Sequence, residues 1–402
     1  MIIPFKKYFK ALQTKQLIQK NDTTIETQSY ILKDYTIAVY FSPTPRTIYQ
    51  LEQWFACFQY LENTYKIVII TRKISTFNWL KKHTHFTIVF CRSLNELIDF
   101  YEKNNLKIIL YVNHGVENFQ SLTHRDAFHI HINHGESEKT STISNQANAY
   151  NYVFIVGDAA YDKYQSNLLK VDMTNFIQIG RPQLEYCEPI PELNHLDKTK
   201  KIILYAPTWE GTHESMNYTS LNDYGLSIIT QILEHPNTYL LYKPHPNTGS
   251  RDTSTQKIHK KLLTLVAKHK KGKLFKTGDI NNIYPYIDIA IFDNSAVAID
   301  YLAIDKPMIM TDMFFKLQGK RTQPKIIGAT RLLQSNECNN LIKILFEEIK
   351  LDTKKVARNT LKTYFLGNYN YLKKESTHTF INELERLMKE RDFLLKKRLK
   401  EY

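Results

Sequence analysis

The 402-residue sequence lacks several common signatures, and each absence removes a class of protein. No uncharged apolar run reaches about 18 residues, so the sequence predicts no transmembrane helix. The four cysteines form no Cys-x-x-Cys pair and have no zinc-ligand spacing, which indicates free thiols in a reducing compartment. The N-terminal apolar run is too short for the core of a signal peptide, so we expect a cytoplasmic protein.

Nucleotide and hydrolase motifs are missing as well. There is no Gly-x-Gly-x-x-Gly after the first expected strand and no Gly-x-x-x-x-Gly-Lys-Ser/Thr, which disfavours a dinucleotide dehydrogenase and a P-loop kinase. The absence of Gly-x-Ser-x-Gly disfavours an α/β-hydrolase. Acidic residues are in deficit, and the resulting net charge of +14 favours a polyanionic partner. Because no nucleic-acid-binding module is recognisable, the charge is assigned to phosphate-rich substrates or an anionic membrane, and no nucleic-acid partner is predicted.

What the sequence does contain is an alternation of apolar β-type runs and helical patterns. The expected strands are Tyr35–Phe41, Lys66–Thr71, Phe86–Cys91, Lys107–Asn113, Phe128–Asn133, Tyr152–Val156, Phe176–Ile179, Lys201–Ala206, Tyr239–Tyr242, Asp288–Phe292 and Met308–Met310. The expected helices include Thr47–Tyr60, Leu94–Glu102, Leu221–Leu233, Gln256–Lys268 and Ala296–Ile304. Strands that are apolar on both faces and alternate with helices indicate parallel sheets covered on both sides. The sequence therefore predicts an α/β protein of two doubly wound, Rossmann-like domains facing a cleft.

A polar stretch rich in proline separates the two series of strands and sets the domain boundaries. We expect a basic N-terminal segment at 1–34, a first Rossmann-like domain at 35–182, a linker at 183–200, a second Rossmann-like domain at 201–375 and a basic C-terminal helix at 376–402. In such sheets ligands bind beyond the carboxyl ends of the strands. The residues that suggest chemistry follow those ends.

Two Asn-His-Gly sequences follow neighbouring strands of the first series. His134 precedes Gly135, which leaves an exposed imidazole beside a backbone that a ligand can approach, and such a histidine suits a general base acting on an alcohol. Lys139 could pair with phosphate. His114 either lines the same pocket mouth or is structural, and we favour the structural role. His129 and His131 share a strand face, but no carboxylate or cysteine completes a metal site, so none is predicted.

Three clusters follow strands of the second series. Thr208, in Ala-Pro-Thr-Trp, either contacts a diphosphate or belongs to a turn. His245, in Lys-Pro-His-Pro, is held by two prolines next to Lys243, which suits the stabilisation of a phosphate leaving group. In the third cluster, Asn294, Ser295 and Ala296 begin an expected helix that carries Asp300. A helix start of this kind either binds an anion or is an ordinary N-cap.

Together these clusters resemble the CDP-glycerol glycerophosphotransferase family, which includes teichoic-acid primases and polymerases. The resemblance rests on His-Gly…Lys-Thr, Ala-Pro-Thr-Trp, Lys-Pro-His-Pro and Asp-Asn-Ser…Asp-Tyr, in that order, across about residues 110–315. It implies a GT-B-like fold, an acceptor side in the first domain (His114, His134, Gly135 and Lys139) and a donor side in the second (Thr208, Lys243, His245, Asn294, Ser295, Ala296 and Asp300). His134 and His245 match the two important histidines of the family.

The implied reaction is the transfer of glycerol phosphate, or a related alditol phosphate, from a CDP-activated donor to a hydroxyl acceptor, with release of CMP, in teichoic-acid or capsule-like polymer synthesis. His134 would be the base, a protonated His245 would stabilise the leaving CMP, and Asp300 would bind ribose or orient a neighbour; the two histidines could also exchange roles. No cofactor is assigned, and a divalent cation stays an open alternative.

The sequence departs from the family pattern at acidic residues. Glu136 and Glu138 stand where the family often reads Thr-Pro-Leu after His-Gly, and Glu210 stands where a basic residue is common. Acidic side chains there would disfavour a long polyphosphate acceptor.

Two other functions stay open at this stage. One is a GT-B glycosyltransferase that uses a nucleotide sugar; the other is a non-catalytic, basic membrane-binding protein. The C-terminal segment 381–402 combines leucines at helical spacing with many lysines and arginines, as does Phe5–Leu12 in part. Such helices can lie on an anionic membrane, so we expect peripheral binding to the inner face of the cell membrane, where a lipid-linked or polymeric acceptor would be presented. The alternative is a C-terminal helix that packs its apolar stripe on the domains and leaves a solvated charged face.

Overall fold

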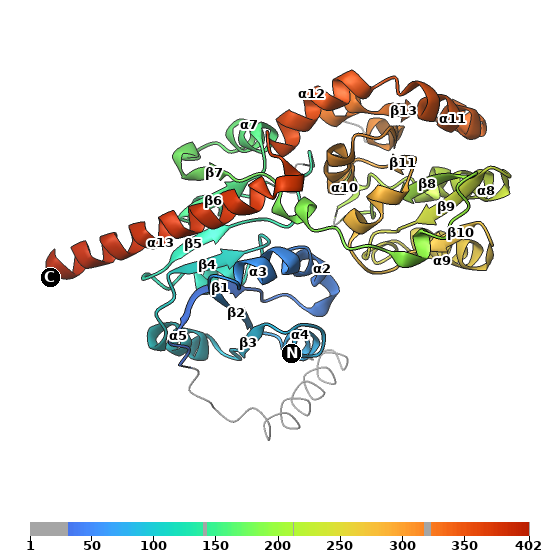
Figure 1. Ribbon diagram of the computed structural model, residues 1–402. Coiled ribbons are helices and arrows are strands. Elements are labelled where there is room, and N and C mark those ends of the chain that lie inside the picture. The colour runs from blue at the N-terminus through green and yellow to red at the C-terminus, as the bar shows by residue number, and fades with distance from the viewer. Residues whose placement is uncertain (1–30, 140–142, 212, 317–322, 402) are drawn as a thin grey trace. The chain divides into compact units, whose positions relative to one another are not determined.

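The computed structural model describes residues 31–139, 143–211, 213–316 and 323–401 (Figure 1). Most of the predicted basic segment 1–34, including Phe5–Leu12, lies outside these residues, and so does Thr140. Two parallel sheets organise the rest. The first has the strand order β3-β2-β1-β4-β5-β6-β7, and its strands are β1 (Tyr35–Tyr40), β2 (Lys66–Thr71), β3 (Thr87–Phe90), β4 (Ile108–Tyr111), β5 (Phe128–His131), β6 (Tyr152–Ile155) and β7 (Phe176–Gln178).

The second sheet has the order β10-β9-β8-β11-β12-β13. Its strands are β8 (Lys201–Ala206), β9 (Thr238–Tyr242), β10 (Gly272–Leu274), β11 (Ile289–Phe292), β12 (Met308–Thr311) and β13 (Arg331–Leu333). Every printed pairing in both sheets is parallel, for example Ile289 of β11 beside Ile203 of β8. The α/β class and the parallel sheets are therefore confirmed.

Helices connect the strands. They are α2 (Tyr49–Glu52), α3 (Phe55–Leu61), α4 (Ile74–His83), α5 (Leu94–Lys103), α6 (Asn118–Ser121), α7 (Asp158–Asn167), α8 (Leu226–Glu234), α9 (Thr253–Lys268), α10 (Ala296–Asp300), α11 (Leu341–Leu351), α12 (Lys355–Leu366) and α13 (Glu375–Glu401). Alternate residues of β8 pack on opposite layers. Ile203 and Tyr205 join a core with α8, α9 and α11, whereas Leu204 and Ala206 join a core with α10 and α12. The absence of a polar face in this strand follows from burial on both sides.

The chain divides into two compact units. Unit 1 contains residues 1–48, 58–129 and 387–402, and unit 2 contains residues 49–57 and 130–386. Unit 2 holds the whole second sheet together with β6 and β7. It also takes in the short segment 49–57, which is far from the rest of that unit in the sequence.

Every expected strand forms within a few residues of its predicted bounds, but two strands and several helix details were not foreseen. β10 and β13 are three residues long and contain glycine, lysine or arginine, so they carry no apolar run. The expected helix 47–60 breaks into a 3₁₀ turn, α2 and α3. The expected helix 296–304 is α-helical only to Asp300 and continues as a 3₁₀ turn. The expected linker 183–200 contains short 3₁₀ turns.

Candidate active site

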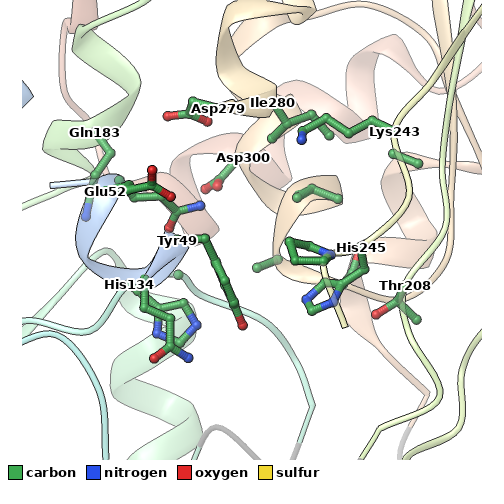
Figure 2. A pocket seen from close by; sticks show the side chains of 18 of the residues that line it. Tyr49, Glu52, His134, Gln183, Thr208, Lys243, His245, Asp279, Ile280 and Asp300 are labelled. Carbon is green, nitrogen blue, oxygen red and sulfur yellow. The ribbon is translucent and has the colours of Figure 1, made fainter. Parts of the chain in front are cut away.

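A cavity of about 640 Å³ lies within unit 2, and all of the residues that line it belong to that unit (Figure 2). The lining includes nine of the residues that the sequence singled out: His134, Gly135, Lys139, Thr208, Lys243, His245, Ser295, Ala296 and Asp300. Thr208, His245 and Ser295 follow β8, β9 and β11, which are neighbours in the second sheet. The carboxyl ends of adjacent parallel strands thus bring these side chains together.

His134 is held in a tightly bonded turn after β5. Asn133 has a positive φ of 48°, an uncommon conformation that asparagine tolerates better than most residues. Its side-chain Oδ1 accepts the His134 backbone N–H at 2.8 Å, and its Nδ2 donates to the Gly135 carbonyl at 2.8 Å. The Trp54 indole donates to the Asn133 carbonyl at 2.6 Å. The Asn133 carbonyl, the His134 N–H and the Gly135 carbonyl therefore each have a fixed partner.

A buried ion pair completes the support of this turn. Arg181 donates from Nε and Nη2 to the two oxygens of Asp300 at 3.0 and 3.1 Å, and Nη2 also donates to the His134 carbonyl at 2.9 Å. Arg181 is 2% exposed and Asp300 1%. A Cβ at Gly135 would lie 3.3 Å from the Ala296 Cβ, so the turn also packs on α10. Of the two roles suggested for Asp300, this geometry favours orienting a neighbour.

Arg181 is brought to this place by a glycine. Gly180 has a φ of 74°, and a Cβ there would come within 2.8 Å of Tyr369 and Ser376. The Ser376 hydroxyl donates to the Ile179 carbonyl at 2.7 Å, which fixes the chain just before Arg181. No side chain larger than hydrogen fits at position 180 without a shift of these neighbours.

His245 is fixed in a different way. Its ring stacks on Trp209, with centroids 5.7 Å apart and planes 11° apart. Its Nδ1 accepts the Asn247 backbone N–H at 3.1 Å, so Nε2 carries the proton of the neutral ring. Burial, followed by the positive charges of Lys139, His134 and Lys243, lowers the pKa of His245 to about 3. With this pKa the His245 ring is neutral at neutral pH and has its proton on Nε2, whereas we had expected a protonated ring. Its role toward the leaving CMP stays a prediction.

Lys139, which the resemblance placed on the acceptor side, contacts Thr208, which it placed on the donor side. Its Nζ donates to the Thr208 hydroxyl at 2.9 Å and lies 5.3 Å from the Tyr218 ring centre. Burial lowers the pKa of Lys139 to about 8, and Asp293 acts in the opposite direction. The Thr208 backbone N–H is itself fixed by Asp293, at 2.9 Å. A half-buried lysine with a hydroxyl partner is well suited to bind a phosphate oxygen.

The three acidic departures from the family pattern are tied to the protein's own backbone and lysines. Glu210 accepts the backbone N–H groups of Gly249 and Arg251 at 3.0 and 2.9 Å. Glu136 pairs with Lys163 at 2.8 Å. Their negative charges are therefore already matched, and they present less repulsion to a phosphate-rich ligand than the sequence suggested.

Glu138 is also held by hydrogen bonds from the protein's own backbone. Its carboxylate accepts the backbone N–H groups of Lys325 and Ile326, both at 2.8 Å. Burial raises the pKa of Glu138, and these two hydrogen bonds oppose the rise. It anchors the start of the 3₁₀ turn at Lys325–Ala329.

Ser295 is the N-cap residue of α10, but its side chain makes no capping bond and donates instead to the Asp293 carbonyl at 3.1 Å. Lys243 donates to the Thr277 carbonyl at 3.4 Å, and burial lowers its pKa, against the opposing charges of Asp279 and Glu52. Asn294 is buried but does not line the cavity. The Lys243 ammonium group and the Ser295 side chain thus line the same cavity as His245, and each is held by a backbone carbonyl.

The remaining histidines have other surroundings. His114 follows β4 in unit 1 and is absent from the cavity lining, so its acceptor role stays a prediction. His129 shares a 2.7 Å hydrogen bond with the Tyr111 hydroxyl, and burial lowers its pKa to about 4. His131 stacks on Tyr150. Within the described ranges, no three His, Cys, Asp or Glu side chains are grouped so that they could hold a metal ion.

Sequence reasoning missed the segment 49–57 entirely. Six of its residues line the cavity: Tyr49, Gln50, Glu52, Gln53, Phe55 and Ala56. Tyr49 lies edge-on to both His134 and His245 (Figure 2). The segment reads as an ordinary amphipathic helix, and only the fold reveals its place.

The comparisons with known proteins agree with this geometry. A model of the CDP-glycerol:poly(glycerophosphate) glycerophosphotransferase family matches residues 20–313. The chain belongs to this family. The resemblance inferred from the sequence is thereby confirmed, and its span now includes the segment 49–57.

Individual relatives are more distant. The teichoic acid ribitol-phosphate polymerase TarK of Staphylococcus aureus is 27% identical over 112 residues, which is 28% of this chain and 20% of TarK. The wall teichoic acid polymerase TagF has a similar structure, with a TM-score of 0.59 and 14% identity over 96% of this chain and 98% of the TagF chain. A UDP-GlcNAc 2-epimerase from Neisseria meningitidis has a TM-score of 0.56 and 13% identity over 87% of this chain and 100% of its own. These structural likenesses establish the GT-B-like fold.

Proposed function

We propose that this protein transfers glycerol phosphate, or a related alditol phosphate, from a CDP-activated donor to a hydroxyl acceptor and releases CMP. The observation that carries the proposal is the convergence of His134, His245, Lys139 and Lys243 on one cavity in a chain of the glycerophosphotransferase family. Two imidazoles and two half-buried ammonium groups suit a reaction in which a hydroxyl is deprotonated and a diphosphate carries the negative charge.

The acceptor oxygen forms a bond to the β-phosphorus of the donor while the bond between that phosphorus and the CMP oxygen breaks. His134 is the base that takes the acceptor proton, because its turn is fixed by Asn133, Trp54 and Arg181 and its imidazole lines the cavity. Position and charge stabilisation dominate a transfer of this kind, so a rigid base is an advantage.

The leaving CMP is stabilised from the donor side. His245 donates from Nε2, and Lys139 and Thr208, which are 2.9 Å apart, bind diphosphate oxygens together. Lys243 supplies a second positive charge. These groups are fixed before the substrate arrives, which is what makes such electrostatic stabilisation effective.

Purified protein incubated with CDP-glycerol, CDP-ribitol or a UDP-sugar, with glycerol-phosphate oligomers as acceptor, tests the reaction. We expect CMP release from a CDP-alditol that depends on the acceptor, and no UDP release from the sugar donor. UDP release without CMP release would favour a glycosyltransferase. No turnover of any donor, with normal folding by circular dichroism, would contradict the proposal.

We also propose that the C-terminal end of α13 binds an anionic membrane surface. Within the residues the structure describes, none of the helices combines the length and hydropathy that a membrane span requires. On the last turns of α13, Phe393, Leu394 and Leu399 are 67, 44 and 69% exposed. The lysines of the same turns, Lys396, Lys397 and Lys400, are also exposed. Exposed apolar groups among cations fit an anionic lipid interface.

We propose a shorter lipid-binding segment than the 381–402 expected from the sequence. Leu384, Leu387 and Met388 are buried, so the first half of the helix is a packing element. Arg391 is also buried and donates to the Asp126 carbonyl at 2.6 Å, within unit 1. The lipid-binding part is therefore reduced to residues 393–400.

Flotation with phosphatidylglycerol vesicles tests this role. The triple variant Phe393→Ser, Leu394→Ser, Leu399→Ser should stay in solution, and high salt should weaken binding of the wild type. Leu351 and Val356 are 63 and 82% exposed elsewhere on the surface, and their serine variants are the matched control. Equal flotation of the triple variant and the wild type would contradict the proposal.

A further inference from the structure

Tyr49 lies between the two histidines that the proposed reaction uses. Its ring centre is 6.0 Å from that of His134, at an interplanar angle of 83°, and 5.7 Å from that of His245, at 79°. Figure 2 shows its side chain reaching between the two imidazoles, with the hydroxyl at the far end. A group that bridges His134 and His245 must therefore pass beside Tyr49.

The position of Tyr49 is tied to that of His134. Tyr49 begins α2, and Trp54 follows on the same short segment. The Trp54 indole donates to the carbonyl of Asn133, the residue before His134, and its ring packs on Phe380 at a centroid distance of 5.4 Å. The segment and the His134 turn therefore form one framework within unit 2.

The hydroxyl of Tyr49 is suited to donate a hydrogen bond at neutral pH. Burial raises the pKa of Tyr49, against an opposing hydrogen bond with the Gln50 side chain, so the phenol keeps its proton. During the transfer the β-phosphorus keeps its ester oxygen to the alditol, so negative charge is concentrated on its two non-bridging oxygens. In the proposed reaction His134 faces the attacking oxygen and His245 the leaving one, and Tyr49 lies between these two rings. Its hydroxyl is therefore placed to add a neutral donor to the cations of Lys139 and Lys243 at the non-bridging oxygens.

We propose that Tyr49 is a catalytic residue whose hydroxyl donates a hydrogen bond to a non-bridging oxygen of the phosphoryl group as that group passes from donor to acceptor. This inference rests on the proposed function. The bond from the acceptor oxygen to the β-phosphorus forms, the bond from that phosphorus to the CMP oxygen breaks, and the acceptor proton goes to His134. Tyr49 keeps its own proton throughout and acts only as a donor.

The substitution Tyr49→Phe tests this directly, because it keeps the ring between the histidines and removes only the hydroxyl. We expect kcat for CMP release to fall by about 10- to 100-fold, the effect of losing a hydrogen bond to a charged group. The Kd for CDP, measured by calorimetry, should stay unchanged. Tyr364→Phe is the matched control: Tyr364 donates to Asp162 at 2.7 Å and does not line the cavity, so its loss should leave kcat intact.

A donor with sulfur in place of a non-bridging β-oxygen gives a second readout. Sulfur is a poorer hydrogen-bond acceptor, so the wild type should be slowed by this donor, and Tyr49→Phe should be slowed much less. A merely structural role for Tyr49 would leave the oxygen-to-sulfur rate ratio the same in both proteins.

The outcomes separate this inference from the proposed function. An active wild type with a Tyr49→Phe variant of equal kcat overturns the role of Tyr49 and leaves the reaction standing. A wild type that releases no CMP from any CDP-alditol overturns both. A loss of CDP affinity in Tyr49→Phe equal to its loss of kcat would also overturn the inference, because the hydroxyl would then bind the donor before the transfer.

Discussion

The two histidines of the cavity are held by opposite means. His245 is fixed mainly by its immediate sequence: prolines stand on both sides, and the Asn247 backbone N–H reaches its ring. His134 is fixed by residues far away along the chain, namely Trp54, 79 residues before Asn133, and Arg181, 47 residues after His134. Local rigidity is visible in a sequence, whereas rigidity imposed by the fold is not. Substitutions at and around each residue test whether His134 and His245 also have different roles in the reaction.

Replacement of His134 should separate chemistry from binding most strongly. His134→Gln should lower the rate of transfer by about 10³-fold, the usual range for loss of a general base. The Kd for CDP should stay within about twofold, because the donor groups follow β8, β9 and β11. Calorimetry with CDP and a CMP-release assay measure the two effects. A variant that transfers at a normal rate, or that loses CDP affinity, would contradict the division of labour.

Replacement of His245 should affect the donor side. His245→Ala removes a preorganised donor and should lower kcat by about 10²-fold while the fold survives. Unlike the His134 variant, it should also weaken CDP binding, since a neutral Nε2–H contacts the diphosphate in both ground and transition states. The same two assays measure this. Near-normal CMP release by a folded His245→Ala protein would remove this residue from the mechanism.

The hydrogen bond from Arg181 to the His134 carbonyl can be weakened without changing the imidazole itself. Arg181→Lys keeps the positive charge. A single ammonium group, however, cannot replace the guanidinium group, which donates to both oxygens of Asp300 and to the His134 carbonyl. We expect kcat to fall by about tenfold with CDP affinity unchanged, as seen for a misplaced base.

A second buried arginine provides the control for this prediction. The Arg358 guanidinium forms ion pairs with Asp305 and Asp352 at 3.0 and 2.7 Å. Arg358 is fully buried and does not line the cavity. Arg358→Lys should lower the midpoint of thermal unfolding as Arg181→Lys does, yet leave kcat unchanged. Equal losses of kcat in both variants would mean that Arg181 acts on stability alone.

The smallest expected effect concerns pH. Lys139 has a pKa of about 8, so it is charged below that pH and neutral above it. Since it binds the diphosphate as a cation, CDP affinity should weaken by about tenfold as the pH rises from about 7 to about 9.5. His245, with a pKa of about 3, should not contribute to this change between about pH 7 and 9.5. Lys139→Met should bind CDP more weakly at neutral pH and show no alkaline decline; an unchanged decline would assign it to another group.

The comparison of the two histidines also explains what the sequence could predict. The strands, their parallel arrangement and the clusters after β5, β8, β9 and β11 could be predicted. They depend on apolar runs and on prolines at strand ends, which are local features of the sequence. Tyr49, Trp54 and Arg181 carry no local signal, because their roles depend on which distant segments meet.

The effect of charged and titratable side chains in the cavity was predicted least well from the sequence. Glu210 seemed to oppose a phosphate ligand, but its carboxylate is used by the amides of Gly249 and Arg251. His245 seemed suited to carry a proton, but burial and three neighbouring positive groups keep it neutral. In both cases the sequence gives the side chain and its formal charge. It does not give the neighbouring groups that decide how that charge acts in the folded protein.

The membership of residues 49–57 in unit 2 has a practical consequence for dissecting the protein. A recombinant fragment of residues 130–386 would contain every nucleotide-side group and would still lack Tyr49 and the Trp54 indole that closes the His134 turn. Such a fragment would expose the face on which Phe380 receives Trp54. Supplying a synthetic peptide of residues 45–60 in trans is therefore the appropriate complementation experiment, and inactivity of the fragment alone would say nothing about the chemistry of its histidines.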